Sequence, residues 1–300
     1  MPFYTESLGL PDSAFALLRD LIRERTGLFY ENEKGDLLTD KLAPLVIDRG
    51  FTSFLDYYYL LKYDSDSGED WKRVMDALSV QETYFWREMD QIRALVDVLA
   101  PRHFSTFPGK PLRIWSAACA SGEEPLSIAM ALSERGWFDR APIEIAATDA
   151  SARAIEKAQQ GLYRGRSFRA LPPGLRDKYF TQEQGGWRIA PELRARIKWS
   201  IANLMTEPEV AHLAASNVIF CRNVFIYFSD DSIRKAVSLF FRLMPSPGYL
   251  FVAASESLLR LTTGFEFEEI GGAFVYVKRQ QAGEPHSAGK AEWPMADRQQ

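Results

Sequence analysis

The sequence has 300 residues, of which 46% are hydrophobic and 25% are charged, a mixture that is typical of a soluble globular protein and excludes extended disorder. Its 36 basic and 40 acidic residues give a net charge of −4, which excludes an overall basic footprint for nucleic acid. Two cysteines and three widely separated histidines predict neither a disulfide scaffold nor a metal site.

The chain shows no secretory signal and no apolar stretch of the roughly 20 residues needed to cross a membrane, so we expect no membrane insertion. Its only cysteines are Cys119 and Cys221. So few cysteines are typical of a protein that works in a reducing compartment, and we expect the protein to be cytoplasmic.

Residues 1–85 have the apolar spacing of helices and lack the alternation of strands. One helix is predicted from about Asp12, an acidic residue that can cap it, to Gly27, a residue that favours a helix end. A second helix begins near Ser53, and a third spans about 71–78. We therefore expect an all-helical N-terminal domain, whose nine basic and sixteen acidic residues give it a net charge of −7.

From Leu112 onward, strand-like runs alternate with helix-like segments. The strand-like runs are LRIWSAAC, IEIAATD, IKWSIANL, NVIFCRNVFIYF and GYLFVAAS, and PLSIAMALSERG, SARAIEKAQQG and DDSIRKAVSLFFRLM are helix-like. This alternation predicts an α/β domain over residues 86–280, built on a doubly wound, mostly parallel Rossmann-like sheet. The closing run FEFEEIGGAFVYVKR predicts an antiparallel hairpin added to that sheet.

One stretch, about residues 165–198, interrupts the alternation. Gly185 and Gly186 form a turn signal between two short strand-like runs, which predicts a small inserted antiparallel β-subdomain. Residues 153–198 contain eleven basic and four acidic residues, a net charge of +7, which is either a binding surface or simply a solvated face. Residues 281–300 are polar and aperiodic, and we expect a disordered tail there.

The run WSAACASGEEP places a turn of small residues between a strand and a helix, where parallel sheets form ligand crevices. A diphosphate-binding turn needs three glycines, but only Gly122 is present. Glu123 and Glu124 add negative charge at the helix start, which favours a neutral or cationic ligand over a diphosphate. Alternatively, both carboxylates only complement the helix dipole.

Asp149 ends the next strand-like run, where a carboxylate can accept hydrogen bonds from ribose hydroxyls. The alternative is that Asp149 caps the following helix. With the small-residue turn, it predicts a cofactor that carries adenosine. The missing glycines favour S-adenosylmethionine over a nicotinamide cofactor.

Further polar residues follow later strands. Asn203, Arg222 and Asn223 offer paired donors and acceptors for an adenine edge or a carboxylate. Tyr227 can line the same pocket or serve in packing. Thr83 and Arg87 are four residues apart, so they share one face and can cover the crevice if their segment is helical.

Six runs occur in a fixed order over about residues 75–278: ETYFWRE, RIWSAACASGEEPLSIAMAL, IAATDASARAIEKAQQGLY, IANL, NVIFCRNVFIYF and SESL. In this order they resemble the CheR-type chemotaxis receptor glutamate O-methyltransferases, and the set is far more specific than any single run. The resemblance implies an all-helical N-terminal domain, a methyltransferase domain with a Rossmann-like sheet and a small inserted β-subdomain.

The resemblance also implies methyl transfer from S-adenosylmethionine to glutamate side chains on the cytoplasmic coiled coil of chemoreceptors, leaving S-adenosylhomocysteine. The β-subdomain can then contact the receptor tail, and we expect a monomer. The implied cofactor residues are Gln81, Thr83, Arg87, Glu124, Asp149, Asn203, Leu204, Arg222 and Asn223. Gln81 departs from the family, where Asn is common at this position. Arg87 and Tyr227 are the implied catalytic residues, since both can orient the substrate carboxylate.

This chemistry needs no general base, because a glutamate with a reference pKa of about 4.3 is already ionised at neutral pH. Two alternatives remain at this stage. The same fold can methylate another nucleophile, such as a small acid, or it can be a non-catalytic module that senses the cofactor and docks signalling proteins. A nicotinamide oxidoreductase is disfavoured by the glycine count.

Overall fold

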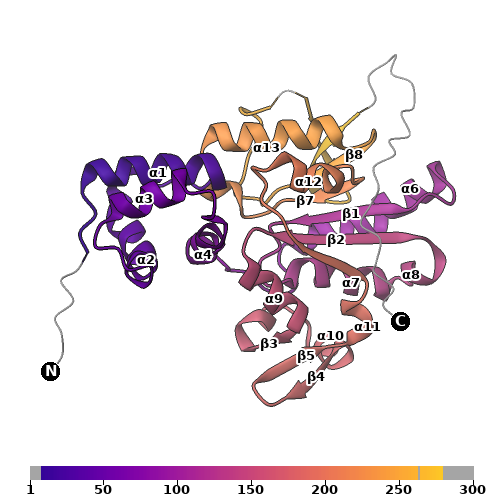
Figure 1. The fold of residues 1–300 in the computed structure, drawn as a ribbon. Coiled ribbons are helices and arrows are strands. Elements are labelled where there is room, and N and C mark those ends of the chain that lie inside the picture. The colour runs from indigo at the N-terminus through magenta and orange to yellow at the C-terminus, as the bar shows by residue number, and fades with distance from the viewer. Residues whose placement is uncertain (1–7, 263, 280–300) are drawn as a thin grey trace.

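The structure is a computed structural model that describes residues 8–262 and 264–279 (Figure 1). The tail predicted for residues 281–300 lies outside the described residues. Within the described ranges, none of the helices combines the length and the apolar character needed to cross a bilayer. The helical N-terminal part lies to one side of a large sheet, and a small second sheet lies below it in the view of Figure 1.

The N-terminal part consists of α1 (Asp12–Thr26), a short turn η1 (Asn32–Lys34), α2 (Gly35–Asp48), α3 (Phe54–Tyr63) and α4 (Gly68–Leu78). The three predicted helices are confirmed as α1, α3 and α4. Ser53 caps α3, its hydroxyl accepting from the Leu55 amide at 3.0 Å. The sequence pattern does not predict α2, because Pro44 lies inside it and proline normally interrupts helices.

The rest of the described chain alternates helices and strands. Its helices are α5 (Met89–Arg93), the π-helical η2 (Ala94–Leu99), α6 (Ala100–Thr106), α7 (Glu123–Glu134), α8 (Trp137–Arg140), α9 (Ala152–Gln160), α10 (Pro173–Tyr179), α11 (Pro191–Arg194), α12 (Glu207–Ala214) and α13 (Asp230–Leu243), with 3-10 turns η3 (Gly165–Phe168) and η4 (Phe225–Tyr227). Its strands are β1 (Leu112–Ala117), β2 (Ile143–Asp149), β3 (Leu162–Tyr163), β4 (Phe180–Glu183), β5 (Gly186–Ile189), β6 (Ile197–Ile201), β7 (Val218–Phe220), β8 (Gly248–Phe251), β9 (Glu266–Ile270) and β10 (Ala273–Lys278).

The large sheet has the strand order β6-β2-β1-β7-β8-β10-β9, which confirms the predicted α/β fold. Its first five strands are parallel, and β10 and β9 form the predicted antiparallel hairpin. Successive residues of β1 point to opposite faces: Ile114 packs in the layer that contains α7, and Trp115 packs in the layer that contains α13. The strands β2 and β6 lie on one side of β1, and the later strands, from β7 onward, lie on its other side. The strand order therefore reverses between β1 and β7, and ligands bind at such a switch point.

A second, three-stranded sheet of order β3-β5-β4 is antiparallel, in agreement with the predicted inserted unit. It begins at Leu162, and Ile197 already belongs to β6 of the large sheet. The unit packs around Phe85, whose fully buried ring lies 4.8 to 5.4 Å from the rings of Tyr163, Phe168 and Phe180. The segment just after the helical part is therefore held by the insertion.

The helical part is joined by backbone contacts to the segment around η4, which follows the central strand β7. The Phe29 amide donates to the Tyr227 carbonyl at 2.9 Å, and Leu28 forms a β-bridge with Phe228. Gly27 ends α1 with φ 81°, and a Cβ at this position would lie 2.6 Å from the Phe228 ring. Glycine is therefore required here both by the backbone and by the close approach of the two parts.

We predict that Gly27→Ala destabilises the protein more than Gly50→Ala does. Both glycines have nearly the same positive φ, 81° and 82°, but a Cβ on Gly50 meets nothing within 4 Å. Gly50→Ala, the control, therefore lowers the free energy of unfolding only by the left-handed strain of about 1–2 kcal/mol. Gly27→Ala introduces the same strain and also an overpacking penalty of about 1–3 kcal/mol. Urea denaturation measures both losses, and equal losses would contradict the role of the Phe228 contact.

Candidate active site

A small cavity of about 40 Å³ lies at the carboxyl end of β1, at the switch point of the sheet. It is enclosed by the segment before α5 and by the loops that follow β1 and β7. Its lining residues are Val80, Glu82, Thr83, Tyr84, Arg87, Ile92, Ala118, Cys119, Ala120, Glu124, Ser127, Arg222 and Asn223. The structure thus brings together five of the predicted site residues, namely Thr83, Arg87, Glu124, Arg222 and Asn223.

The loop after β1 forms the floor of this cavity through an unusual run of backbone conformations. Ala118, Ala120 and Gly122 have φ values of 55°, 49° and 92°. A Cβ on Gly122 would lie 2.9 Å from both Ala158 and Trp199, so glycine is needed there for packing as well as for φ. At the other positions alanine is small enough to leave the loop backbone open to a ligand.

Asp149 fixes this loop from the end of β2. Its two carboxylate oxygens accept from the amides of Ala120 and Ser151, each at 2.9 Å. Ser151, not Asp149, supplies the side-chain cap of α9. Burial raises the pKa of Asp149, and the hydrogen bonds from the two backbone amides oppose that rise. Since a carboxylate has about four acceptor sites, acceptor capacity is left for a ligand.

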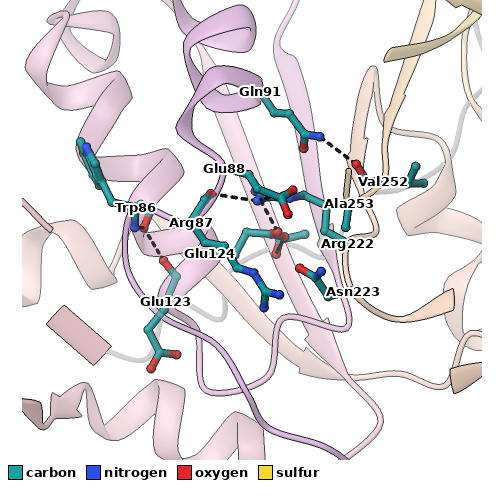
Figure 2. A network of polar contacts seen from close by, with 12 residues as sticks. Trp86, Arg87, Glu88, Gln91, Glu123, Glu124, Arg222, Asn223, Val252 and Ala253 are labelled. Atoms are coloured by element: carbon teal, nitrogen blue, oxygen red, sulfur yellow. Dashed lines mark hydrogen bonds and ion pairs between the residues drawn. The ribbon is translucent and has the colours of Figure 1, made fainter. Parts of the chain in front are cut away.

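A buried ion-pair network, drawn in Figure 2, forms the wall opposite this loop. The Arg222 side chain is 2% exposed, and its Nη1 lies 3.4 Å from Glu124 Oε2. Its Nη2 donates to the Arg87 carbonyl at 2.8 Å and lies 3.1 Å from Glu88 Oε2. The Ser116 hydroxyl donates to Glu124 Oε1 at 2.6 Å. Burial raises the pKa of Glu124, and Arg222 is the largest influence that opposes this.

The two neighbouring glutamates of the β1–α7 turn point in different directions. Glu123 is directed away from Arg222 in Figure 2, and its carboxylate accepts from the hydroxyls of Ser121 at 2.8 Å and Ser167 at 2.9 Å. Burial raises the pKa of Glu123, with these hydrogen bonds opposing the rise. Only Glu124 lines the cavity, whereas Glu123 connects the turn to η3 of the inserted unit.

The idea that Thr83 and Arg87 share a helix face is wrong. Residues 79–84 have no helical structure, and residues 85–88 form turns in which Trp86 and Glu88 have φ values of 69° and 49°. Both predicted residues nevertheless line the cavity, because the segment folds across its mouth. The Trp86 amide donates to Ser127 Oγ at 3.1 Å, which holds the turn against α7.

Five predicted site residues do not line the cavity: Asp149, described above, and four others. The side-chain amide of Gln81 donates to Ser151 Oγ at 3.3 Å and accepts from Lys157 Nζ at 2.9 Å. The Asn203 amide donates to the Arg25 carbonyl at 2.7 Å and accepts from the Met205 amide at 3.0 Å. Leu204 is buried in the apolar layer that contains α13, and Tyr227 is half-buried in η4, next to the joint with the helical part.

Glu256, which sequence reasoning did not assign to the site, shapes the loop that carries Asn223. Its Oε1 accepts from the amides of Val224, Phe225 and Ile226 at 2.8, 2.8 and 3.3 Å, and its Oε2 accepts from those of Asn223 and Ala253 at 3.0 and 2.8 Å. Glu88 was also missed. Glu256 could not be found from the sequence, because its partners are backbone amides, which are present at almost every residue.

Comparison with known proteins gives the class of this chain, a methyltransferase. Residues 81–273 match the family model described as "CheR methyltransferase, SAM binding domain", and residues 13–79 match "CheR methyltransferase, all-alpha domain". The chain belongs to the CheR methyltransferase family, and its cofactor is S-adenosylmethionine.

Among curated relatives, the chain is 36% identical over 272 residues to chemotaxis protein methyltransferase 2 of Vibrio cholerae, covering 90% of this chain and 94% of the relative. It is 31% identical to the chemotaxis protein methyltransferase of Escherichia coli K12, covering 87% and 90% of the two chains. It is 30% identical to chemotaxis protein methyltransferase 1 of Pseudomonas aeruginosa, covering 87% and 96%.

The described residues fit the charged end of this cofactor, whereas a cavity of about 40 Å³ is too small to hold the whole molecule. The open loop of small residues permits close approach, and the buried Glu124 carboxylate suits a cationic group. Arg222 Nε is buried and has no hydrogen-bonding partner among the described residues, so the guanidinium retains a donor next to the cavity. A buried donor of this kind is normally satisfied by a bound group or by water.

We predict that Glu256→Gln destabilises the protein by at least about 2 kcal/mol, because glutamine turns an NH₂ group toward amides that need an acceptor. The matched control is Glu266→Gln, which removes an ion pair between exposed side chains, Glu266 and Arg279. Loss of such an exposed ion pair lowers the free energy of unfolding by less than about 1 kcal/mol. Denaturation with urea compares the two, and a loss no larger than that of the control would contradict the role of Glu256.

Proposed function

We propose that this enzyme transfers the methyl group of S-adenosylmethionine to glutamate side chains of chemoreceptors, which gives glutamate methyl esters and S-adenosylhomocysteine. The observation that carries the proposal is the match of residues 81–273 to the S-adenosylmethionine-binding CheR domain, whose crevice here contains the Arg222–Glu124 pair. The names of the curated relatives, chemotaxis protein methyltransferases, support the substrate class.

The chemistry requires little from the protein beyond positioning. The bound cofactor supplies an electrophilic methyl group on a sulfonium, and a glutamate of ordinary pKa, about 4.3, is already a carboxylate at neutral pH. The chain therefore needs no general base. It has to hold two reactants in line and exclude water, and such orientation lowers a barrier by up to about 7–11 kcal/mol.

For the cofactor we propose a division of the site that follows the family resemblance. Thr83, Arg87 and Glu124 bind the methionine end, with Glu124 receiving its ammonium group, and Arg222 and Asn223 form the adjoining wall of the pocket. This is supported by the position of all five on the cavity. Asp149 binds the ribose, Asn203 and Leu204 lie on the adenine side, and Gln81 supplies a further hydrogen bond to the cofactor.

Arg87 and Tyr227 are proposed to orient the substrate carboxylate. The Arg87 guanidinium lines the cavity and donates to the Glu82 carbonyl at 3.1 Å. Its charge is thus shared with a neutral acceptor and the Tyr84 ring, whose centre is 5.4 Å away. An arginine held in this way orients an incoming carboxylate without forming an exclusive ion pair that would weaken the nucleophile.

We further propose that the substrate is the cytoplasmic coiled coil of the receptor and that the enzyme acts as a cytoplasmic monomer. Its two cysteines, Cys119 and Cys221, are free and buried, which suits a reducing compartment. A receptor tail can bind the small sheet, because β4 pairs only with β5 among the described strands and leaves an open edge.

The proposal is tested by incubating the enzyme with S-adenosylmethionine labelled in the methyl group and membranes that carry the organism's receptors. We expect label on a receptor band that is released by mild base, because carboxyl esters hydrolyse under those conditions. Label that resists base, or label only on small acids, would refute the reaction. Cofactor binding without any transfer would instead indicate a non-catalytic module.

We predict that Arg87→Ala lowers kcat about tenfold or more, a barrier increase of about 1.4 kcal/mol, with a smaller loss of affinity for S-adenosylhomocysteine. Arg140→Ala is the control, because that guanidinium packs over Trp137 in α8 and does not line the cavity. The labelled-methyl assay measures kcat, and titration calorimetry measures the affinity for S-adenosylhomocysteine. Unchanged turnover in the Arg87 variant would remove it from the catalytic residues.

A further inference from the structure

Three arginines lie near Glu82 and Tyr84 of the cavity lining, and we call them the rim arginine cluster: Arg87, Arg166 and Arg169. The Arg169 guanidinium lies 3.7 Å from the centre of the Tyr84 ring, and that of Arg87 lies 5.4 Å from it. Arg166 is exposed on η3, which Arg169 directly follows. Tyr84 itself lines the cavity, so the cluster lies where a macromolecular substrate has to approach.

The cluster carries more positive charge than its surroundings neutralise. Among the ion pairs of the described residues, only Arg169–Glu82, at 2.8 Å, includes a member of the cluster. The hydrogen bond from Arg169 holds the pKa of Glu82 below its ordinary value, and Arg166 and Arg87 act in the same direction. Arg87 also acts on the buried Glu124, so the surplus lies on the other two members: Arg166 and Arg169 share one exposed carboxylate, Glu82, which leaves a formal excess of one positive charge outside the cavity.

The three arginines are held in a common framework, although two of them belong to the inserted unit. The Phe85 amide donates to the Ser167 carbonyl at 2.8 Å, and the Phe85 ring stacks on that of Phe168 at 5.4 Å. The Ser167 hydroxyl donates to Glu123 at the start of α7. Arg166 and Arg169 are thereby fixed relative to the segment that carries Arg87.

The wider charge distribution favours one direction of approach. Residues 153–198 have a net charge of +7, whereas residues 1–85 have a net charge of −7. An anionic partner is repelled by the helical part and attracted to the inserted unit. Fields of this kind act mainly on association rate and on the choice of partner, and they weaken in salt.

We propose that the rim arginine cluster is a docking surface for acidic side chains that flank the target glutamate on the receptor. It selects glutamates that lie in acidic surroundings and directs them to the cavity from the side of the inserted unit. This inference rests on the proposed function, because it concerns the protein substrate of the same site.

The test compares two double variants that change charge equally. Arg166→Glu with Arg169→Glu reverses the cluster, and Arg140→Glu with Arg242→Glu reverses two exposed arginines of α8 and α13. The substrate is the purified cytoplasmic fragment of a receptor that the wild-type enzyme labels. kcat and KM are measured at about 50 mM and about 300 mM salt, and the Kd for S-adenosylhomocysteine is measured by calorimetry.

We expect reversal of the cluster to lower kcat/KM about tenfold at low salt, mainly through KM, with kcat and the cofactor Kd unchanged. The difference shrinks at high salt, and the control double variant stays near the wild type. Arg166→Glu alone, which breaks no side-chain hydrogen bond among the described residues, shows a smaller effect of the same kind. An equal loss in the control, a loss that is independent of salt, or an unchanged KM would overturn the inference.

A substrate variant supplies a second arm. Replacing the acidic residues that flank the methylated glutamate by glutamine raises KM for the wild-type enzyme, and Arg166→Glu then has little further effect, because coupled partners are not additive. Additive effects would overturn the inference. If the wild-type enzyme labels no receptor, the proposed function fails first, whereas labelling that is insensitive to the cluster refutes this inference alone.

Discussion

The site depends on the buried guanidinium of Arg222. A buried cation is tolerated only where acceptors surround it, since its desolvation alone costs several kcal/mol. Its three acceptors come from two different segments: Glu124 begins α7, while the Arg87 carbonyl and the Glu88 carboxylate belong to the segment after the helical part. Compensating this one charge therefore fastens that segment across the carboxyl end of the sheet.

The same neighbourhood concentrates unfavourable backbone conformations. Within residues 8–262 and 264–279, five residues other than glycine have positive φ, and all five lie at the cavity or adjoin it: Trp86, Glu88, Ala118, Ala120 and Asn223. Such conformations cost about 1–3 kcal/mol each and persist only where surrounding contacts determine them. Here the contacts are specific, since Asp149 binds the Ala120 amide and Glu256 binds the Asn223 amide. Two carboxylates thus hold the strained loops on either side of Arg222.

The fold also divides the charge. In Figure 1 the negative helical part lies to one side of the large sheet and the positive inserted unit lies below it, and the segment between them connects to both. Gln81 binds α9, Phe85 is surrounded by the inserted unit, and Arg87 reaches the cavity. A short segment thereby contacts α9, the inserted unit and the cavity at once.

The fold class could be predicted because its signals are local: apolar periodicity separates the helical part from the alternating strands and helices, and Gly185–Gly186 indicates the inserted hairpin. Residue types at a helix start and at a strand end also indicate Glu124 and Asn223 as candidate site residues. Tertiary structure alone decided the rest. The non-helical path of the segment from Thr83 to Arg87 and the partners of Arg222 depend on contacts between residues up to 135 positions apart. Local patterns do not predict such pairing, because these ion pairs and hydrogen bonds stabilise the protein only once the distant segments are packed together.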